Sequence, residues 1–427
     1  MIACSPPRAL FALLLVSTAA SPADAVELSL ADALARGENQ SPEVLRARAA
    51  HRAVESRRVG AEVLLPSNPV VTGSAGQLRV ETLTTDGVTY HGGNALQWGA
   101  RLEQAIEVGG QRGARIDEVN RAVEAAAARE RLALVETHAA VRAAYAAAWI
   151  AGERVAAERA REQLGQQLLE SVRLRASSGA SSGVDLALAE TEAGRIAAAR
   201  VAAEVDQASQ MSRLRILVGL GPGEPLQLST GLAEVVSPAG APIADLLARA
   251  LQRRADLAAL RSDAAELDAA ITRLGREAVP TPTLFADVAA QPNVGDQQGQ
   301  LYLGGGLSLP IPVARRNQGE RARARAERDR VEAERALTER IIAEEVARAH
   351  GELSRRNTEV ELYNRTVLPA AEQVARLTGE GYRSGKFDLF RVIAAAREQA
   401  DARGEHLQAL SALWQARIAL DRAMGEP

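Results

Sequence analysis

The chain repeats the order of its structural signals once, at a distance of about 210 residues. Segment 30–48 aligns with segment 243–261 at a constant spacing of 213, with six identities in nineteen positions. In each half a break rich in proline follows, around Pro66 and Pro280, and then come short alternating segments, a very long helical stretch, a Gly/Ser-rich turn and a returning helix. A period this long exceeds that of solenoid repeats, so it predicts a duplicated half-structure.

The composition favours long helices over large compact cores. Aromatic residues make up only 3% of the 427 residues, while Ala, Arg, Glu and Leu dominate, which is typical of helices packed side by side. The net charge of -3 gives no basic field that would attract nucleic acid. We therefore expect no nucleic-acid partner.

The first 25 residues predict a secretory signal peptide. Arg8 precedes an apolar run, and Ala23-Asp24-Ala25 supplies a cleavage site of small residues. Cys4 is the only cysteine and comes before the apolar run, whereas a lipidated cysteine should follow it. We expect neither lipidation nor a disulfide in the mature chain.

Alternating segments in both halves predict strands with one apolar face. From Leu96 to Val108 apolar and polar residues alternate, which places Leu102 and Arg101 on opposite faces. No later segment approaches the roughly 18 apolar residues of a spanning helix, so any membrane crossing must use a β-barrel. The alternative is a soluble antiparallel sheet with one wet face. The predicted barrel wall consists of Leu96, Trp98, Leu102, Leu301 and Leu303.

The predicted strands cannot close a barrel within one chain. The smallest spanning barrels need about eight strands, and we expect four here. The chain must therefore oligomerise: two copies would supply eight strands and three would supply twelve.

Long helical hairpins follow the strands. Between residues 113 and 176 there is no proline, and about 60 helical residues span roughly 90 Å. In the second half Pro369 should kink or restart its helix, because it cannot donate a backbone hydrogen bond. The predicted organisation is a signal peptide (1–25), a first repeat (26–223; strands 69–108, hairpin 113–218), a linker (224–242) and a second repeat (243–427; strands 282–312, hairpin 317–425).

With these features the chain resembles the TolC-like outer-membrane efflux protein family over residues 26–427. The motifs that carry the resemblance are the repeat starts, the Leu65-Pro66 break, the turns at 178–186 and 382–389, and Leu309-Pro310-Ile311-Pro312. The resemblance implies a mainly α fold with a small membrane β-barrel: a homotrimeric helical tube in the periplasm, topped by a shared twelve-stranded barrel in outer-membrane lipid. It also implies docking to a periplasmic adaptor (membrane fusion) protein that serves an inner-membrane pump.

A short motif between strand and helix points to a branch of that family. Glu107-Val108-Gly109-Gly110-Gln111-Arg112 is similar to the Glu-Leu-Gly-Gly-Lys-Arg stretch of its heavy-metal branch, with two substitutions. The resemblance therefore implies a passive exit duct for heavy-metal cations, driven by a pump of the resistance-nodulation-division class. A drug-efflux or type I secretion duct remains an alternative, as does a periplasmic adaptor, which should instead carry a single hairpin flanked by lipoyl-like strands.

The two hairpin turns are the candidate docking tips and periplasmic entrance. We expect positive φ at the turn glycines. For the two aspartates two interpretations stay open: caps of the returning helices, or acidic groups repeated around a pore entrance. In some family members an acidic residue stands where this chain has Arg391, which argues against a second acidic ring. The candidate residues are Gly179, Gly183, Asp185, Leu186, Gly385, Lys386, Asp388, Leu389 and Arg391.

Nothing in the sequence predicts catalysis, a cofactor or a resident metal. The five histidines are scattered without ligand spacing, and the mature chain has no cysteine to help them. Neither a nucleophile elbow nor a phosphate loop is present in the sequence. We expect a protein that is not an enzyme.

Overall fold

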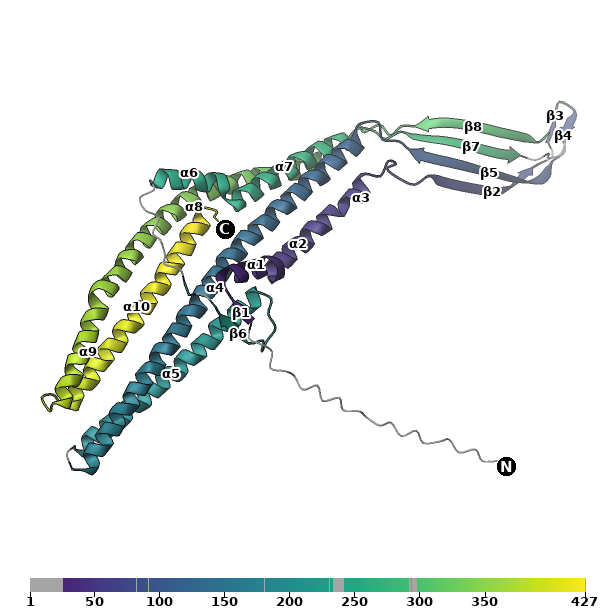
Figure 1. Ribbon diagram of the computed structural model, residues 1–427. Coiled ribbons are helices and arrows are strands. Elements are labelled where there is room, and N and C mark those ends of the chain that lie inside the picture. Colours follow the sequence, from purple (N-terminus) through teal and green to yellow (C-terminus); the bar gives the residue numbers. More distant parts are fainter. Residues whose placement is uncertain are drawn as a thin grey trace, which may run out of the picture.

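The computed structural model describes residues 26–81, 83–90, 92–179, 181–229, 231–232, 242–291, 293 and 298–426. The expected signal peptide and residues 230 and 233–241 of the expected linker lie outside this part. Figure 1 shows an elongated molecule with a sheet at one end, two helical hairpin turns at the other, and long helices between them. Among the described helices, none has the length and apolar content of a membrane span.

The first long hairpin consists of α4 (Gln111–Ser177) and α5 (Gly183–Leu217). The 67 residues of α4 correspond to a rod of about 100 Å. This rod is uninterrupted because its sequence contains no proline and few glycines. Its buried positions are mostly small or branched residues, alanine above all, which let neighbouring helices approach closely.

The second hairpin is interrupted on its outgoing side. It consists of α8 (Gln318–Leu362), the π-helical turn η1 (Tyr363–Val367), α9 (Leu368–Arg383) and α10 (Leu389–Ala423). Pro369 lies in the first turn of α9, directly after η1, and the backbone keeps right-handed helical angles across this junction at Val367 and Leu368. The predicted irregularity at this proline is present as the π turn, and the helix continues through it without a break.

Short helices lie along the rods in both halves. The first half has α1 (Leu30–Gln40), α2 (Pro42–Glu55) and α3 (Arg57–Ala61), and the second has α6 (Ile243–Arg253) and α7 (Ala255–Arg276). The helix breaks at Ser41 and Arg254 occupy aligned positions of the two halves, in the register found in the sequence. Strands β1 (Val26–Leu28) and β6 (Leu226–Leu228) pair in parallel, and the sequence did not predict this pair.

The sheet combines two strands from each half. It contains β2 (Val70–Val80), β5 (Gly93–Ala105), β7 (Thr283–Gln291) and β8 (Gln300–Ser308), antiparallel in the order β2-β5-β7-β8. A small hairpin of β3 (Leu83–Thr85) and β4 (Val88–Tyr90) extends beyond it (Figure 1). The segment predicted as a strand from Leu96 to Val108 is shifted: β5 begins at Gly93 and ends at Ala105. Alternation alone does not mark the end of pairing, because an extended connection can keep the same pattern.

Candidate functional site at the hairpin turns and the sheet face

The first hairpin turn is closed by a left-handed glycine and a capping box. Gly179 has φ +76°, and its N–H donates to the carbonyl of Ala176 at 3.0 Å. The α5 helix then starts with Ser182 as its N-cap: Ser182 Oγ accepts the Asp185 N–H at 3.1 Å, and Asp185 Oδ2 accepts the Ser182 N–H at 3.0 Å. These bonds lower the pKa of Asp185. The expectation that Asp185 is the cap is wrong in detail. Ser182 is the N-cap, and Asp185 lies at the third helical position and completes the capping box by accepting the Ser182 N–H.

The second turn repeats this geometry at the equivalent place in the other half. Gly385 also has φ +76°, and its N–H donates to the carbonyl of Tyr382 at 3.0 Å. Here Asp388 is itself the N-cap of α10 and accepts the Arg391 N–H at 2.9 Å. The capping interpretation of Asp388 is confirmed, as are the positive φ angles at both turn glycines.

Two candidate leucines bind the hairpins to each other. Leu389 is only 3% exposed, in a cluster with Val172, Ala189 and Ile393. Leu186 packs against the same cluster from α5 and is half-buried. Both leucines therefore act first through packing within the chain, while Gly183, the first residue of α5, lies at the surface.

The free surface of the second turn is mixed apolar and basic. Lys386 and Arg391 are exposed, and the Arg391 guanidinium lies 5.2 Å from the centre of the Phe387 ring. Phe387 packs so closely on Gly381 that a Cβ at this position would collide with its ring. A shallow groove between α9 and α10 continues from it, lined by Val374, Thr378, Phe387, Arg391, Ala394, Ala395 and Glu398.

Sequence reasoning missed several tip side chains. Phe390 and Val184 are largely exposed beside the two turns. Glu192 is buried on α5 and accepts from Arg397 of α10 at 2.5 Å, with Arg161 of α4 at 3.6 Å. This ion pair ties the two hairpins together. It joins residues 205 positions apart, so no local sequence pattern could predict it.

The motif at residues 107–112 forms the joint between sheet and rods. Gln111 is buried; its Oε1 accepts the Gly109 N–H at 2.7 Å and its Nε2 donates to the carbonyl of Val279 at 3.2 Å. A side chain at Gly109 would collide with Val279. Arg115 pairs with Glu107 at 2.7 Å. The motif therefore locks the first rod to the start of the second half's strands.

The second rod begins with the same device. Asn317, like Gly110, adopts a left-handed conformation (φ 55° and 75°) as the N-cap. Gln318 Oε1 accepts the Arg316 N–H at 2.7 Å, as Gln111 does for Gly109. Each set lies directly before and at the start of its rod, so the duplication extends to the hydrogen bonds of the joints.

The predicted wall residues lie on one face of the sheet. Leu102 is paired with Val71 and Ala286, and Trp98 with Ala75 and Ala290. The same face carries Leu96, Leu301 and Leu303, and all five predicted wall residues are exposed. On the opposite face Arg101 lies 3.8 Å from Asp287 and 4.2 Å from the centre of the Phe285 ring. One face of the sheet is thus apolar, and the other carries charge.

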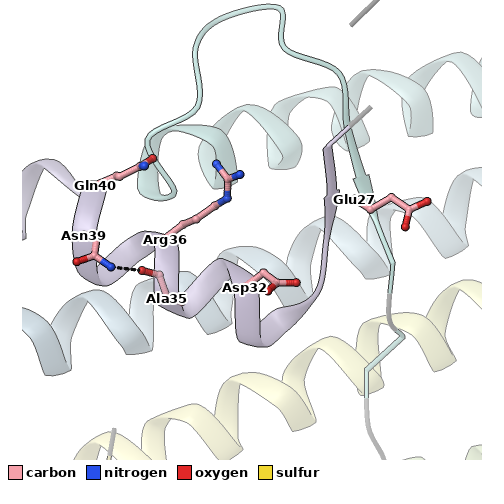
Figure 2. A pocket seen from close by; sticks show the side chains of 6 residues that line it. All are labelled: Glu27, Asp32, Ala35, Arg36, Asn39 and Gln40. Atoms are coloured by element: carbon pink, nitrogen blue, oxygen red, sulfur yellow. Dashed lines mark hydrogen bonds between the residues drawn. The ribbon is translucent and has the colours of Figure 1, made fainter. Parts of the chain in front are cut away.

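In the described part of the chain, neither the pocket beside α1 nor the histidines form a further functional centre. A shallow pocket beside α1 is lined by Glu27, Asp32, Ala35, Arg36, Asn39 and Gln40 (Figure 2). Its Asp32 is engaged in the Ser29 capping box. Within the described ranges, no group of three or more potential metal ligands comes together. His51 and His138 each contact one glutamate, Glu130 at 2.7 Å and Glu38 at 2.8 Å.

Comparisons with known proteins agree with this architecture. Residues 246–426 match the family model described as outer membrane efflux protein. The cobalt-zinc-cadmium resistance protein CzcC of Cupriavidus metallidurans is 27% identical over 329 residues, which is 76% of each chain. A structure of CusC superposes with a TM-score of 0.71 at 16% identity, covering 94% of this chain and 93% of that one. A structure of the outer-membrane channel OprN superposes with a TM-score of 0.71 at 19% identity, covering 93% of this chain and 90% of that one. The predicted fold class is confirmed.

Proposed function

We propose that this chain is a member of the outer membrane efflux protein family, whose model it matches over residues 246–426, and that it forms a trimeric exit duct that carries heavy-metal cations out of the cell. Members of this family are outer-membrane channels that work with periplasmic adaptors and inner-membrane pumps. The observation that carries the proposal is that the two ends of the elongated molecule present different surfaces. An exposed apolar sheet face lies at one end, and two capped hairpin turns lie at the other (Figure 1).

Oligomerisation is inferred from the unfinished sheet, and the number of three copies from the resemblance to the TolC-like family. β2 and β8 are the two edges of the four-stranded sheet, and exposed edges and an exposed apolar face are both unfavourable in water. Three copies joined β8 to β2 would close twelve strands, within the range of spanning barrels. The apolar face, with Leu102 and Trp98, then meets lipid. The face with Arg101 and Asp287 lines a water-filled lumen.

Docking is assigned to the hairpin turns. Their backbones are fixed by the glycines at 179 and 385 and by the caps Ser182 and Asp388. The side chains that point outward, Phe390 and Lys386 among them, offer both apolar contact and charge to an adaptor. Rigid backbone with a mixed surface suits a specific protein contact.

The cargo is inferred from the relative and from the joint. CzcC is a cobalt-zinc-cadmium resistance protein, and the 107–112 motif resembles the heavy-metal branch at the position where the first rod is locked to the strands. A pump of the resistance-nodulation-division class would select the ions and supply the energy. The duct itself would need only a continuous aqueous path.

Deletion of the gene and complementation test this assignment. We expect the deletion strain to lose tolerance to cobalt, zinc or cadmium, and the intact gene to restore it. Native mass measurement of the purified protein in detergent should give three chains. Loss of drug tolerance or of a secreted polypeptide, with metal tolerance unchanged, would point to the alternative ducts. A stable water-soluble monomer would contradict the channel altogether.

A further inference from the structure

The two strand-to-rod connections differ in length although the rods begin alike. β5 ends at Ala105 and α4 begins at Gln111, whereas β8 ends at Ser308 and α8 begins at Gln318. Five residues make the first connection and nine make the second. The first half shows that five are sufficient, so the four additional residues are not needed to span the joint.

The longer connection exposes aliphatic side chains. Ile311 is 76% exposed and Val313 is 81% exposed, and Leu309 is also exposed. The chain passes from the apolar face of β8, with Leu301 and Leu303, directly into these residues. Isolated apolar residues at a surface need no explanation, but a continuous series that extends an apolar sheet face indicates a contact.

The connection ends in an unopposed positive charge. Arg315 and Arg316 follow Val313, and both are exposed. The sequence has no acidic residue from 297 to 319. Arg316 Nε donates to the carbonyl of Pro312 at 2.9 Å, while in the described part of the chain the Arg315 side chain makes no hydrogen bond or ion pair. In the first connection, by contrast, Glu107 neutralises Arg115.

From this arrangement we infer that the connection 309–316 is a binding surface for anionic phospholipid, with aliphatic residues in the acyl region and Arg315 on the headgroup phosphate. This rests on the proposed channel, in which the end of the sheet nearest the rods lies at the phospholipid leaflet. Arginine suits phosphate because its planar fork offers several donors, and each cation near an anionic surface strengthens binding about fivefold. A neighbouring copy is the competing occupant, since Val63 and Leu64 are also exposed before the β2 edge.

Native mass spectrometry of the detergent-solubilised protein tests the surface. Phosphatidylglycerol or phosphatidylethanolamine is added, and the lipid retained by the trimer is counted. We expect the wild type to prefer phosphatidylglycerol and Arg315→Gln to weaken that preference about fivefold, with the difference shrinking in high salt. Arg323→Gln is the matched control, because Arg323 is an exposed arginine on the following helix and its loss removes the same charge.

Results of two kinds would overturn the inference, one from lipid retention and one from trimer stability. One is equal phosphatidylglycerol retention by the wild type and Arg315→Gln, or an equal loss in Arg323→Gln. The other is dissociation of the trimer in lipid-free detergent by Ile311→Ser, which would place the segment against a neighbouring copy. Planar-bilayer conductance of the wild type separates this test from the channel itself. Failure to conduct refutes the proposed function, whereas a conducting trimer without lipid preference refutes only the lipid surface.

Discussion

In the first half a single helix, α4, runs from the joint to the hairpin turn, whereas in the second half the same path is divided among α8, η1 and α9. The backbone conformation at the ends of the two hairpins nevertheless agrees closely. The turn glycines 179 and 385 share φ +76°, and the glycines that end the returning helices, 219 and 425, have φ +69° and +70°. The separation along the chain is the same for both pairs. Duplication is thus preserved most strictly where the backbone must adopt left-handed angles that few residues tolerate.

The interiors of the rods are less constrained because packing can be satisfied in more than one way. In the second half the π turn comes just before Pro369, and Figure 1 shows the path curving from α8 into α9. The Tyr363 hydroxyl donates to Glu405 Oε2 at 3.1 Å across to α10. A π turn places one more residue in a helical turn. The second hairpin therefore has a local irregularity that the first lacks.

The largest effect should come from charging the apolar sheet face in either half. Leu102→Arg and Leu303→Arg each place a cation in lipid, at a cost of roughly 2 to 4 kcal/mol per chain near the midplane. We expect both variants to lose outer-membrane trimer, measured by membrane fractionation and native gel. Arg101→Gln, on the opposite face, should assemble normally. Equal tolerance of Leu102→Arg and Arg101→Gln would mean that the faces are misassigned, and a difference between the two leucine variants would mean that the halves are not equivalent.

The features that could be predicted from the sequence are those that depend on interactions between residues close together in the chain. The alternation that marks β5, the hairpin rods, the irregularity at Pro369 and the positive φ of Gly385 each depend on residues within a few positions of one another. The features that the sequence did not predict are contacts between distant segments or the exact ends of elements. The β1–β6 pair and the Glu192–Arg397 ion pair join segments about 200 residues apart, and only the folded chain brings them together.

The candidate site was predicted in part. The turns are where the sequence placed them, but Ser182 rather than Asp185 is the cap of α5, because serine and aspartate three residues apart can exchange both bonds. Leu389 was expected at a docking surface and is buried between the hairpins. The docking and entrance roles of the nine tip residues stay predictions, as do the limits of the two repeats.

Substitutions at the two joints between strand and rod should have effects of intermediate size, and the two joints can be compared with each other. Gln111→Ala removes a buried side chain, should leave the half-buried Gly109 N–H and Val279 carbonyl without this partner, and should lower the free energy of unfolding by about 1 to 3 kcal/mol. Gln318→Ala removes the equivalent acceptor at an exposed position and should cost about 1 kcal/mol or less. Thermal dissociation of the purified trimer would compare them. Equal midpoints for the two variants would show that the burial difference has no energetic consequence.

The hairpin turns should respond to strain rather than to lost packing. A Cβ at Gly385 meets open space, so Gly385→Val costs only the left-handed conformation, about 1 to 3 kcal/mol. We expect an assembled trimer that no longer crosslinks to its adaptor and no longer confers metal tolerance. Gly385→Asn is the control, since asparagine tolerates this conformation. Gly179→Val should produce the same strain in the first half. Normal crosslinking and export in Gly385→Val would refute the tip assignment, and loss of the trimer would make the glycine a folding determinant.

The smallest effect is expected where the halves differ most visibly. Pro369 already lies in the first turn of α9, a position that tolerates proline, and its fixed φ limits the unfolded chain. Pro369→Ala restores a backbone donor and should let η1 tighten into a continuous α-helix like α4, with stability changed by about 1 kcal/mol or less. Hydrogen exchange should then slow across residues 363–367 and stay unchanged at the equivalent stretch of α4. Persistence of fast exchange after the substitution would show that packing against α10, through Tyr363 and Glu405, maintains the π turn and that the proline merely accommodates it.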